Sequence, residues 1–149
     1  MILKIKYSFI TEVKESVSML LHKSDYENLR SVIWPTFGTV ITFLFTKNNS
    51  TKRVGKIWKN NSEKIQSQFN KLNMRDLGNV ACLVHGISCE GWFDTDNNSI
   101  HVRATESDSD KEIIDTIVHE LLHLATYDKK MTYDEREDLV DKYMKRIKI

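Results

Sequence analysis

Two histidines and a glutamate in the C-terminal half of the chain have the types and spacing of a metal centre. His119 and His123 are four positions apart, and Glu120 directly follows the first histidine. On a helix, residues four apart project from the same face, so both imidazoles can bind one zinc ion. Glu120 lies beside that face and can act as general base on a zinc-bound water that attacks a carbonyl group. The His-Glu-x-x-His pattern therefore predicts one Zn²⁺ per chain and a hydrolase.

The surroundings of the motif predict a buried helix. A wide apolar band runs through it, formed by Ile113, Ile114, Ile117, Val118, Leu121, Leu122 and Ala125. Ser109 and Glu112 form a capping box at its start. Histidine and glutamate side chains in such a band are costly to bury without a partner, and a metal supplies one. The competing interpretation is a chance motif whose polar side chains reach solvent along one seam of the helix.

A third zinc ligand must come from outside the motif helix. Catalytic zinc usually has three protein ligands and one open position. No histidine follows His123, so a carboxylate or an upstream residue has to complete the set. A final helix after Thr132 offers several acidic residues: Asp134, Glu135, Glu137, Asp138 and Asp141.

Glu137 is the preferred third ligand among these residues. It precedes Val140 by three positions, which places it beside the apolar stripe that faces the core. Glu135 is the third residue after Thr132, so its side chain already has a role in capping the helix. Glu135 nevertheless remains the next candidate. Asp141, one turn after Glu137, is predicted to accept the outer N–H of a ligating histidine.

Three further residues are candidates for stabilising an oxyanion. Tyr127 and Tyr133 flank the expected turn between the last two helices, and either hydroxyl could donate to a tetrahedral intermediate. His101 lies on a predicted strand and could point into the cleft. The alternative for His101 is a packing or surface role.

The remaining pattern predicts an α+β fold with a small, mostly antiparallel sheet against the motif helix and a C-terminal helix. Periodicity predicts a strand over 3–9 and helices over 11–23 and 61–72. A capping box at Ser24 and Glu27 predicts a short second helix that ends before Pro35. The other expected elements are a buried strand over 37–46, a loop over 47–51, strand segments over 80–94 and a hairpin over 91–104.

Part of the chain resembles a known family. "HELLHL" followed by "EREDLVD" looks like a small gluzincin-type metallopeptidase of phages and bacteria, in the neighbourhood of the ImmA/IrrE-type peptidases. The resemblance implies a zincin-like fold and a glutamate third ligand in the helix after the motif. "GWFDTDNNSIHVR" resembles the hairpin before the motif helix in that family, which implies that an extended peptide docks along its edge strand. Residues 1–75 resemble nothing recognised, whereas 76–149 carry the hairpin and both helices.

Composition is typical of one globular domain over 1–149. The chain is 40% apolar and 29% charged, with a net charge of +1. Its two cysteines are too few for a disulfide scaffold. No signal peptide and no run of 18 apolar residues is present, so a cytoplasmic protein without a membrane span is expected, in the host cytoplasm if a phage encodes it.

Two questions about partners stay open. Residues 1–78 carry a net charge of +7 and residues 79–149 a net charge of −6. The basic half could contact nucleic acid, although no nucleic-acid motif is present. The expected partner is a protein or peptide substrate. The alternative function is a zinc-stabilised binding or assembly protein without protease activity, for which Glu120 would have no use.

Overall fold

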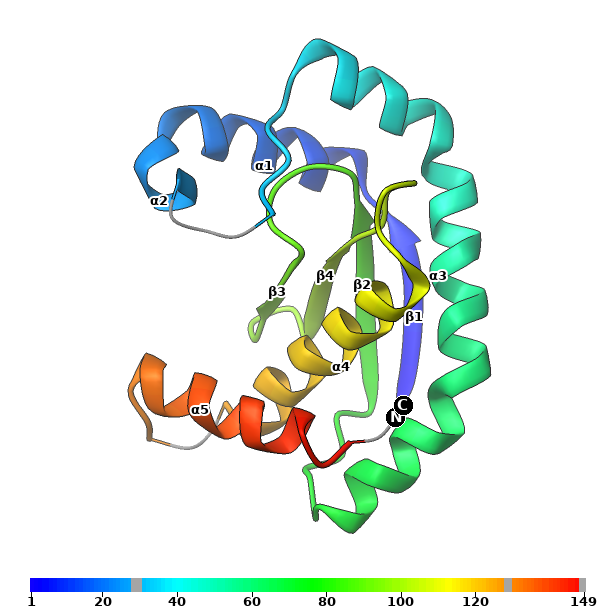
Figure 1. Ribbon diagram of the computed structural model, residues 1–149, viewed down its shortest axis with the longest axis vertical. Coiled ribbons are helices and arrows are strands. Elements are labelled where there is room, and N and C mark those ends of the chain that lie inside the picture. The colour runs from blue at the N-terminus through cyan, green and yellow to red at the C-terminus, as the bar shows by residue number, and fades with distance from the viewer. Residues whose placement is uncertain (28–30, 128–129, 148–149) are drawn as a thin grey trace.

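The computed structural model describes residues 1–27, 31–127 and 130–147, which form a small sheet with helices packed around it (Figure 1). In chain order the elements are β1 (Ile2–Tyr7), α1 (Phe9–Leu21), α2 (Lys23–Glu27), α3 (Phe37–Lys71), β2 (Asn79–His85), β3 (Gly91–Asp94), β4 (Ser99–Arg103), α4 (Asp110–Thr126) and α5 (Tyr133–Met144). The α+β class is confirmed. Within the described residues, no helix has the length and apolar character needed to cross a membrane.

The sheet is mixed, so the expectation of a mostly antiparallel sheet was wrong. Its strand order is β1-β2-β4-β3. β1 pairs with β2 and β2 pairs with β4 in parallel, and only β3 pairs with β4 in antiparallel fashion. Side-chain periodicity shows which residues face the core but not which way a strand runs. The connection from β1 to β2 includes three helices, and such a long crossover permits parallel pairing.

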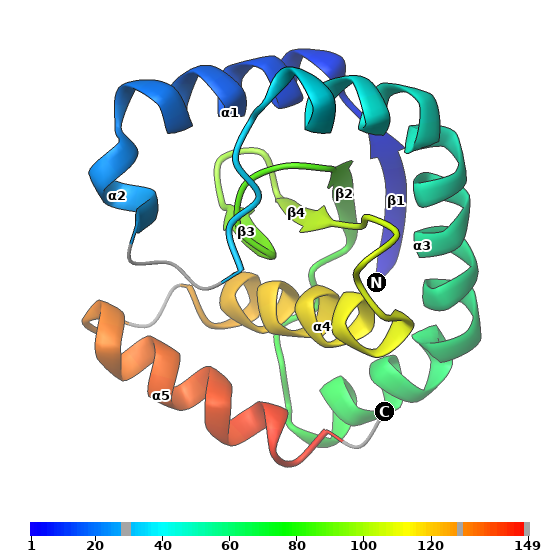
Figure 2. The ribbon, with the colours of Figure 1, turned by 45° about the horizontal axis from the view of Figure 1, so that its top comes forward.

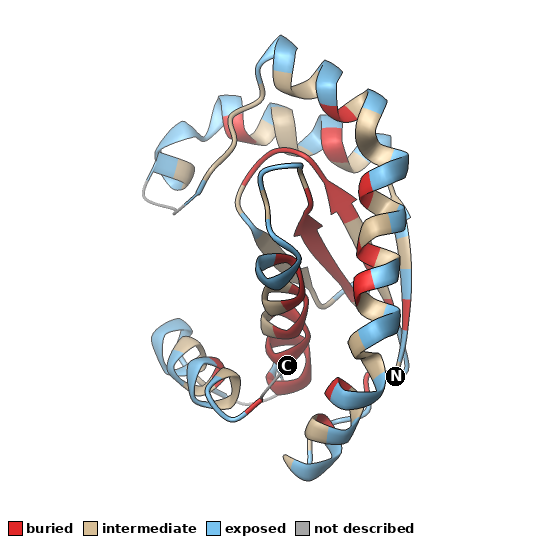
Figure 3. Ribbon diagram, turned by 45° about the vertical axis from the view of Figure 1, so that its right-hand side comes forward, coloured by how far each residue is buried: buried red, intermediate tan, exposed pale blue. Residues whose placement is uncertain are grey.

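The core lies between one face of the sheet and two helices. α3 packs along β1 and β2, whereas α4 crosses β3 and β4. Buried residues from both helices and from β2 and β4 form one hydrophobic cluster, and Figure 3 colours the buried parts of these elements red. Eleven residues of α4 are buried, which confirms the expected central position of the motif helix. The site is therefore built on the most thoroughly packed helix of the molecule.

The predicted strand over 37–46 and loop over 47–51 were wrong, because both segments belong to α3. Thr36 caps this helix through a reciprocal bond with Thr39. The β-branched and aromatic composition suggested a strand, but such propensity depends strongly on context. Phe43 packs in the core, whereas Phe37 and Phe45 are 86% and 84% exposed. The burial pattern of this segment is that of a helix lying on the surface.

The short helix predicted over 24–34 is only partly present. α2 ends at Glu27, and Ser24 lies inside it rather than at its cap. Residues 28–30 lie outside the described part of the chain. Ile33 forms an isolated bridge with Ser88, so the chain before Pro35 is extended. The residue before a proline is in any case biased away from helix.

Helix α1 turns an apolar face to the outside. The exposed apolar residues of α1 lie along one stripe of the helix. They are Phe9, Ile10, Val13, Val17, Leu20 and Leu21. Only Met19 and Glu12 of this helix are buried. Glu12 accepts a hydrogen bond from the backbone N–H of Gly86, at 3.1 Å. The helix is thus attached to the body through the buried side chain of Met19 and the polar contact of Glu12, and its apolar stripe is unpartnered within the described residues.

Candidate metal centre

Three side chains from α4 and α5 converge at their donor atoms. The Nε2 atoms of His119 and His123 are 3.0 Å apart. Oε1 of Glu137 lies 3.2 Å from Nε2 of His123, and Oε2 of Glu137 lies 3.6 Å from Nε2 of His119. This group can hold a metal ion, with one donor atom of each residue within 4.8 Å of the others. The structure thus brings together the two motif histidines and the preferred third residue.

The spacing of these donors fits a small metal ion. Ligands that bind a tetrahedral ion at about 2.0–2.1 Å are about 3.3–3.4 Å from one another. The two Nε2 atoms are 3.0 Å apart, and one Glu137 oxygen lies 3.2 Å from His123 while the other lies 3.6 Å from His119, all around that value. Two imidazole nitrogens and one carboxylate oxygen are donors that zinc and several other divalent metals accept. Among the described residues, no other group of three potential ligands meets the same condition.

Helix capping explains why Glu137, and not Glu135, joins the histidines. Both Glu135 and its cap residue Thr132 take part in a complete capping box, which confirms that prediction. The Glu135 carboxylate accepts a hydrogen bond from the backbone N–H of Thr132 at 2.8 Å, and it is exposed. Glu137 lies two residues further along α5, on the side of the helix that meets α4. The alternative assignment of Glu135 is therefore not supported.

Glu120 lies beside the three donors and opens into the same cleft. Its side chain is only 6% exposed. Burial, together with the nearby carboxylate of Glu137, raises the pKa of Glu120 to about 8. A cation held by the donor group would favour the ionised form and lower that pKa. The position is suited to a carboxyl group that exchanges a proton with a molecule bound at the metal.

The ring of His123 is fixed by packing rather than by an outer hydrogen bond. His123 is 3% exposed and stacks on Phe93, with ring centroids 4.9 Å apart and planes 8° from parallel. Its Nδ1 atom has no hydrogen-bond partner among the described residues. Burial, His119 and Arg136 together lower the pKa of His123 to about 4, so it is neutral, as a ligand must be.

The predicted role of Asp141 is contradicted. Asp141 is exposed, and within the described part of the chain its carboxylate makes no hydrogen bond to either imidazole. It follows Glu137 by one helical turn, but that spacing directs the two side chains only roughly alike. Glu137 is one-third exposed and lies at the edge of the contact between α4 and α5. Asp141 is exposed and lies outside that contact.

His101 faces away from the cleft, so its predicted oxyanion role was wrong. It pairs with Trp92 across β3 and β4, whereas Gly91 pairs with Val102. Because Gly91 faces α4, Trp92 and His101 lie on the other face of the sheet. His101 stacks on Trp92 with centroids 4.2 Å apart, which is the packing role considered as its alternative.

The two tyrosines lie at the margin of the site. Tyr127 is 45% exposed and contacts Phe93 and the guanidinium of Arg136. Tyr133 is 72% exposed, and partial burial together with the carboxylate of Glu137 raises its pKa. Tyr133 is therefore the tyrosine whose electrostatic surroundings include the donor group. An oxyanion role for either residue stays a prediction.

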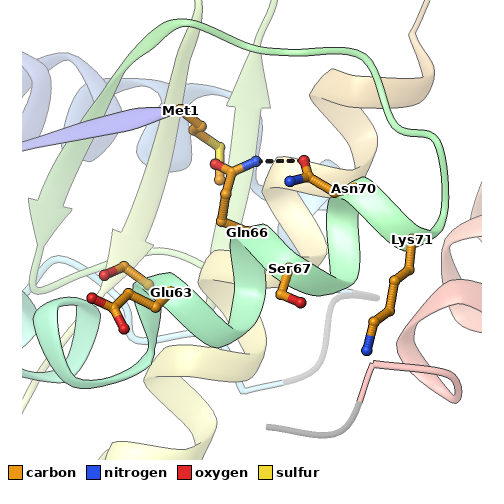
Figure 4. Close-up of a pocket in the computed structure, with 7 residues that line it drawn as sticks. Met1, Glu63, Gln66, Ser67, Asn70 and Lys71 are labelled. Carbon is orange, nitrogen blue, oxygen red and sulfur yellow. Dashed lines mark hydrogen bonds between the residues drawn. The ribbon is translucent and has the colours of Figure 1, made fainter.

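The cleft at the donor group has a volume of about 610 Å³. Its lining comes from the start of β3 and from one face of α4, with Glu137 and Met144 of α5. A hollow of similar size, about 650 Å³, lies on α3 and is lined by Glu63, Gln66 and Lys71 among others (Figure 4). That hollow contains none of the three donor residues. Chemistry, and not size, therefore identifies the candidate site.

Two residues that shape the site had not been identified from the sequence. Gly91 approaches α4 so closely that an added Cβ would lie 2.5 Å from Thr116 and 3.1 Å from Oε1 of Glu120. Phe93, two residues further along β3, stacks on His123. Positions two apart in a strand share a face, so the hairpin pattern could have placed both residues toward the motif helix.

Comparisons of the chain with family models, with curated proteins and with solved structures find no match.

Proposed function

We propose that the chain is a zinc-dependent hydrolase, and most specifically a metallopeptidase with a zincin-like arrangement. The observation that carries the proposal is the convergence of His119, His123 and Glu137 beside the buried carboxyl group of Glu120. A site that only stabilised the fold would have no use for an acid in that place. The cleft also leaves room for a substrate on the same side.

In this proposal each side chain has a separate role. His119, His123 and Glu137 hold zinc, which when bound makes water more acidic and polarises a carbonyl group. Glu120 accepts a proton from the attacking water as the water oxygen bonds to the carbonyl carbon. It then donates that proton to the leaving nitrogen as the carbon–nitrogen bond breaks. Phe93 and the surrounding core keep the His123 ring in place.

The edge strand β3 is the proposed docking site for the peptide. β3 lies at the end of the sheet order and pairs only with β4 among the described strands. Its start at Gly91 lies against Glu120, so a peptide paired with this edge passes the donor group. Backbone hydrogen bonds would then position the scissile bond, with little dependence on side-chain identity.

The proposal is tested by comparing wild-type protein with Glu120→Gln. Both proteins are loaded with zinc, and metal content is measured by mass spectrometry. Each is then incubated with a mixture of unstructured peptides, and new peptide termini are identified by mass spectrometry. We expect about one zinc per chain in both and cleavage only by the wild type. Zinc-loaded wild-type protein that produces no new termini, or a Glu120→Gln variant as active as the wild type, would refute the hydrolase.

A second candidate is a zinc-stabilised binding or assembly protein. The exposed apolar stripe of α1 favours it, because an unpartnered stripe of this kind is typical of a surface that binds another molecule. In that case zinc would mainly hold α4 and α5 together. The two candidates are separated by the same Glu120→Gln variant, which should keep full biological function only in the second.

A further inference from the structure

Acidic side chains line the cleft beyond the donor group. Glu90 precedes β3, while Glu112 and Asp115 lie on α4 about two turns and one turn before His119. The cleft contains five carboxyl groups in all, including those of Glu120 and Glu137, and no lysine or arginine lines it. A divalent ion on the donor group would offset the charge of its own ligand and of the base, and would leave the other three negative charges.

The existing contacts of these three residues leave their charge available. The Glu90 side chain is exposed and makes no hydrogen bond or ion pair within the described part of the chain. Asp115 pairs with Lys111 on the same helix, and such exposed pairs contribute little and are screened by salt. The Ser109 side chain, together with the Ser109 backbone N–H that donates to the Glu112 carboxylate, lowers the pKa of Glu112 and keeps it ionised.

A second hollow continues the acidic lining away from the metal donors. It is lined by Glu15 and Asp25 together with Tyr26 and Trp92. Cys89 lines both this hollow and the cleft, so the two adjoin. Figures 1 and 2 both show α1 and α2 on one side of β3 and α5 on the other. The acidic lining therefore continues from the cleft past Cys89, before the start of β3, into the hollow on the opposite face of the strand.

The burial of Glu120 indicates that the cleft receives a ligand rather than only solvent. Its side chain is 94% buried, lines the cleft and has no hydrogen-bond partner among the described residues. The acidic residues do not form a second metal site, because among the described residues only the His119 group brings three donors together. Separated carboxylates along a groove instead match separated positive charges on an extended ligand.

We propose that the cleft takes a basic segment of a protein or peptide, with lysine or arginine side chains on one side of the bond to be cleaved. This inference rests on the proposed hydrolase function. Glu90 and Asp115 are the residues that contact the basic side chains, because they flank the start of β3 and the exposed face of α4. Long, flexible cationic side chains can reach both from a peptide paired with the edge strand.

The test measures binding separately from cleavage. Zinc-loaded Glu120→Gln protein is titrated into fluorescently labelled octalysine or octaglutamate, and anisotropy is recorded at low salt. Octalysine should bind and octaglutamate should not. A second substitution in the Glu120→Gln protein, either Glu90→Gln or Asp115→Asn, should weaken octalysine binding by about threefold to fivefold, as expected for partly exposed charge pairs. The control is Glu63→Gln, which removes one exposed acidic charge from α3 (Figure 4) and should change nothing.

The outcomes separate this inference from the proposed function. The proposal of a basic ligand is overturned if octalysine does not bind. It is also overturned if Glu63→Gln weakens octalysine binding as much as the cleft variants do. Cleavage of a peptide mixture without enrichment of lysine or arginine on either side of the cut also overturns it, while leaving the hydrolase intact. Octalysine binding through Glu90 and Asp115, with no cleavage by the wild type, supports the basic ligand and refutes the hydrolase.

Discussion

The imidazole of His123 lies flat against the ring of Phe93, so a strand residue fixes the orientation of a residue in the metal-binding group. The histidine has no outer hydrogen bond among the described residues, and the aromatic contact takes over that positioning. The link also connects the edge strand to the candidate metal centre. A change in β3 can therefore be transmitted to the donor group without touching it directly.

Replacing Phe93 with leucine should weaken zinc binding while keeping most of the buried volume. Stacked aromatic pairs contribute about 0.5–1.5 kcal/mol beyond burial, so we expect zinc affinity to fall by up to about tenfold. Competition with a chromophoric chelator measures the affinity. Phe93→Tyr retains the ring and serves as the control. Equal affinity in wild type and Phe93→Leu would show that the stack does not position the histidine.

Glu137 and Glu135 should respond differently to the same substitution. Loss of an outer partner of a ligand already costs about 10–100-fold in metal affinity, so Glu137→Gln should cost at least about 100-fold. Glu135→Gln retains an acceptor for the capping box and should leave zinc affinity unchanged. Zinc titrations of both variants test this. A larger loss in Glu135→Gln would move the third ligand to Glu135.

Gly91 should not tolerate even one added methyl group. The Cβ of an alanine would lie 2.5 Å from Thr116 and 2.9 Å from the carbonyl oxygen of His101. We expect Gly91→Ala to lower the free energy of unfolding by about 1–3 kcal/mol, because the packed helix and strand must move apart.

The matched control is Gly55→Ala in α3, where an added Cβ meets nothing within 4 Å. A half-buried helical glycine with room for a methyl group should, when changed to alanine, stabilise the protein by about 0.5–1 kcal/mol. Urea unfolding of both variants measures the difference. If Gly91→Ala is as stable as the wild type, β3 and α4 are less closely packed than the structure indicates.

Stability should fall as pH rises from about 4.5 to about 7 because of Glu12. Burial raises the pKa of this carboxyl group to about 7, from an ordinary value of 4.5. In that interval the folded state keeps a proton that the unfolded state has lost, so the free energy of unfolding decreases with pH. A shift of this size corresponds to roughly 3 kcal/mol.

Glu12→Gln removes that dependence and keeps an acceptor for the Gly86 N–H. The variant should match the wild type near pH 4 and be more stable at pH 8. Urea unfolding at pH values from 4 to 8 gives the difference in free energy of unfolding between the variant and the wild type. Other titrating groups contribute equally to both proteins and so cancel in this difference, for example His85, whose pKa burial lowers to about 3. A difference that does not vary with pH would show that Glu12 is not protonated in the folded protein.

The sequence predicted the local features of the site well. His119 and His123 share a helical face because of their spacing, and two capping boxes correctly located the starts of α4 and α5. Glu137 was distinguished from Glu135 by the same capping argument. These predictions succeeded because they depend on contacts between residues a few positions apart.

Features that depend on distant parts of the chain were not predictable in the same way. The parallel pairing of β1 with β2 depends on the path of three intervening helices. The segment 37–46 has the composition of a buried strand, yet its Thr36 cap and the contact of Phe43 with the core make it helical. The orientation of His101 depended on the register of the hairpin, where a shift by one residue reverses every side chain.

All three residues of the metal-binding group lie between positions 119 and 137, on two helices that follow each other directly. Closing a short loop costs little chain entropy, so on the proposed function we expect this helical pair to bind its ion without the parallel strand pairing, which needs a much longer loop. Gly91, which brings the edge strand against Glu120, belongs to a separate part of the chain whose pairing forms by other contacts. On the proposed function, metal loading and catalytic competence are separate events in the maturation of the chain. A partly folded molecule would carry the ion and still lack the strand that receives a substrate.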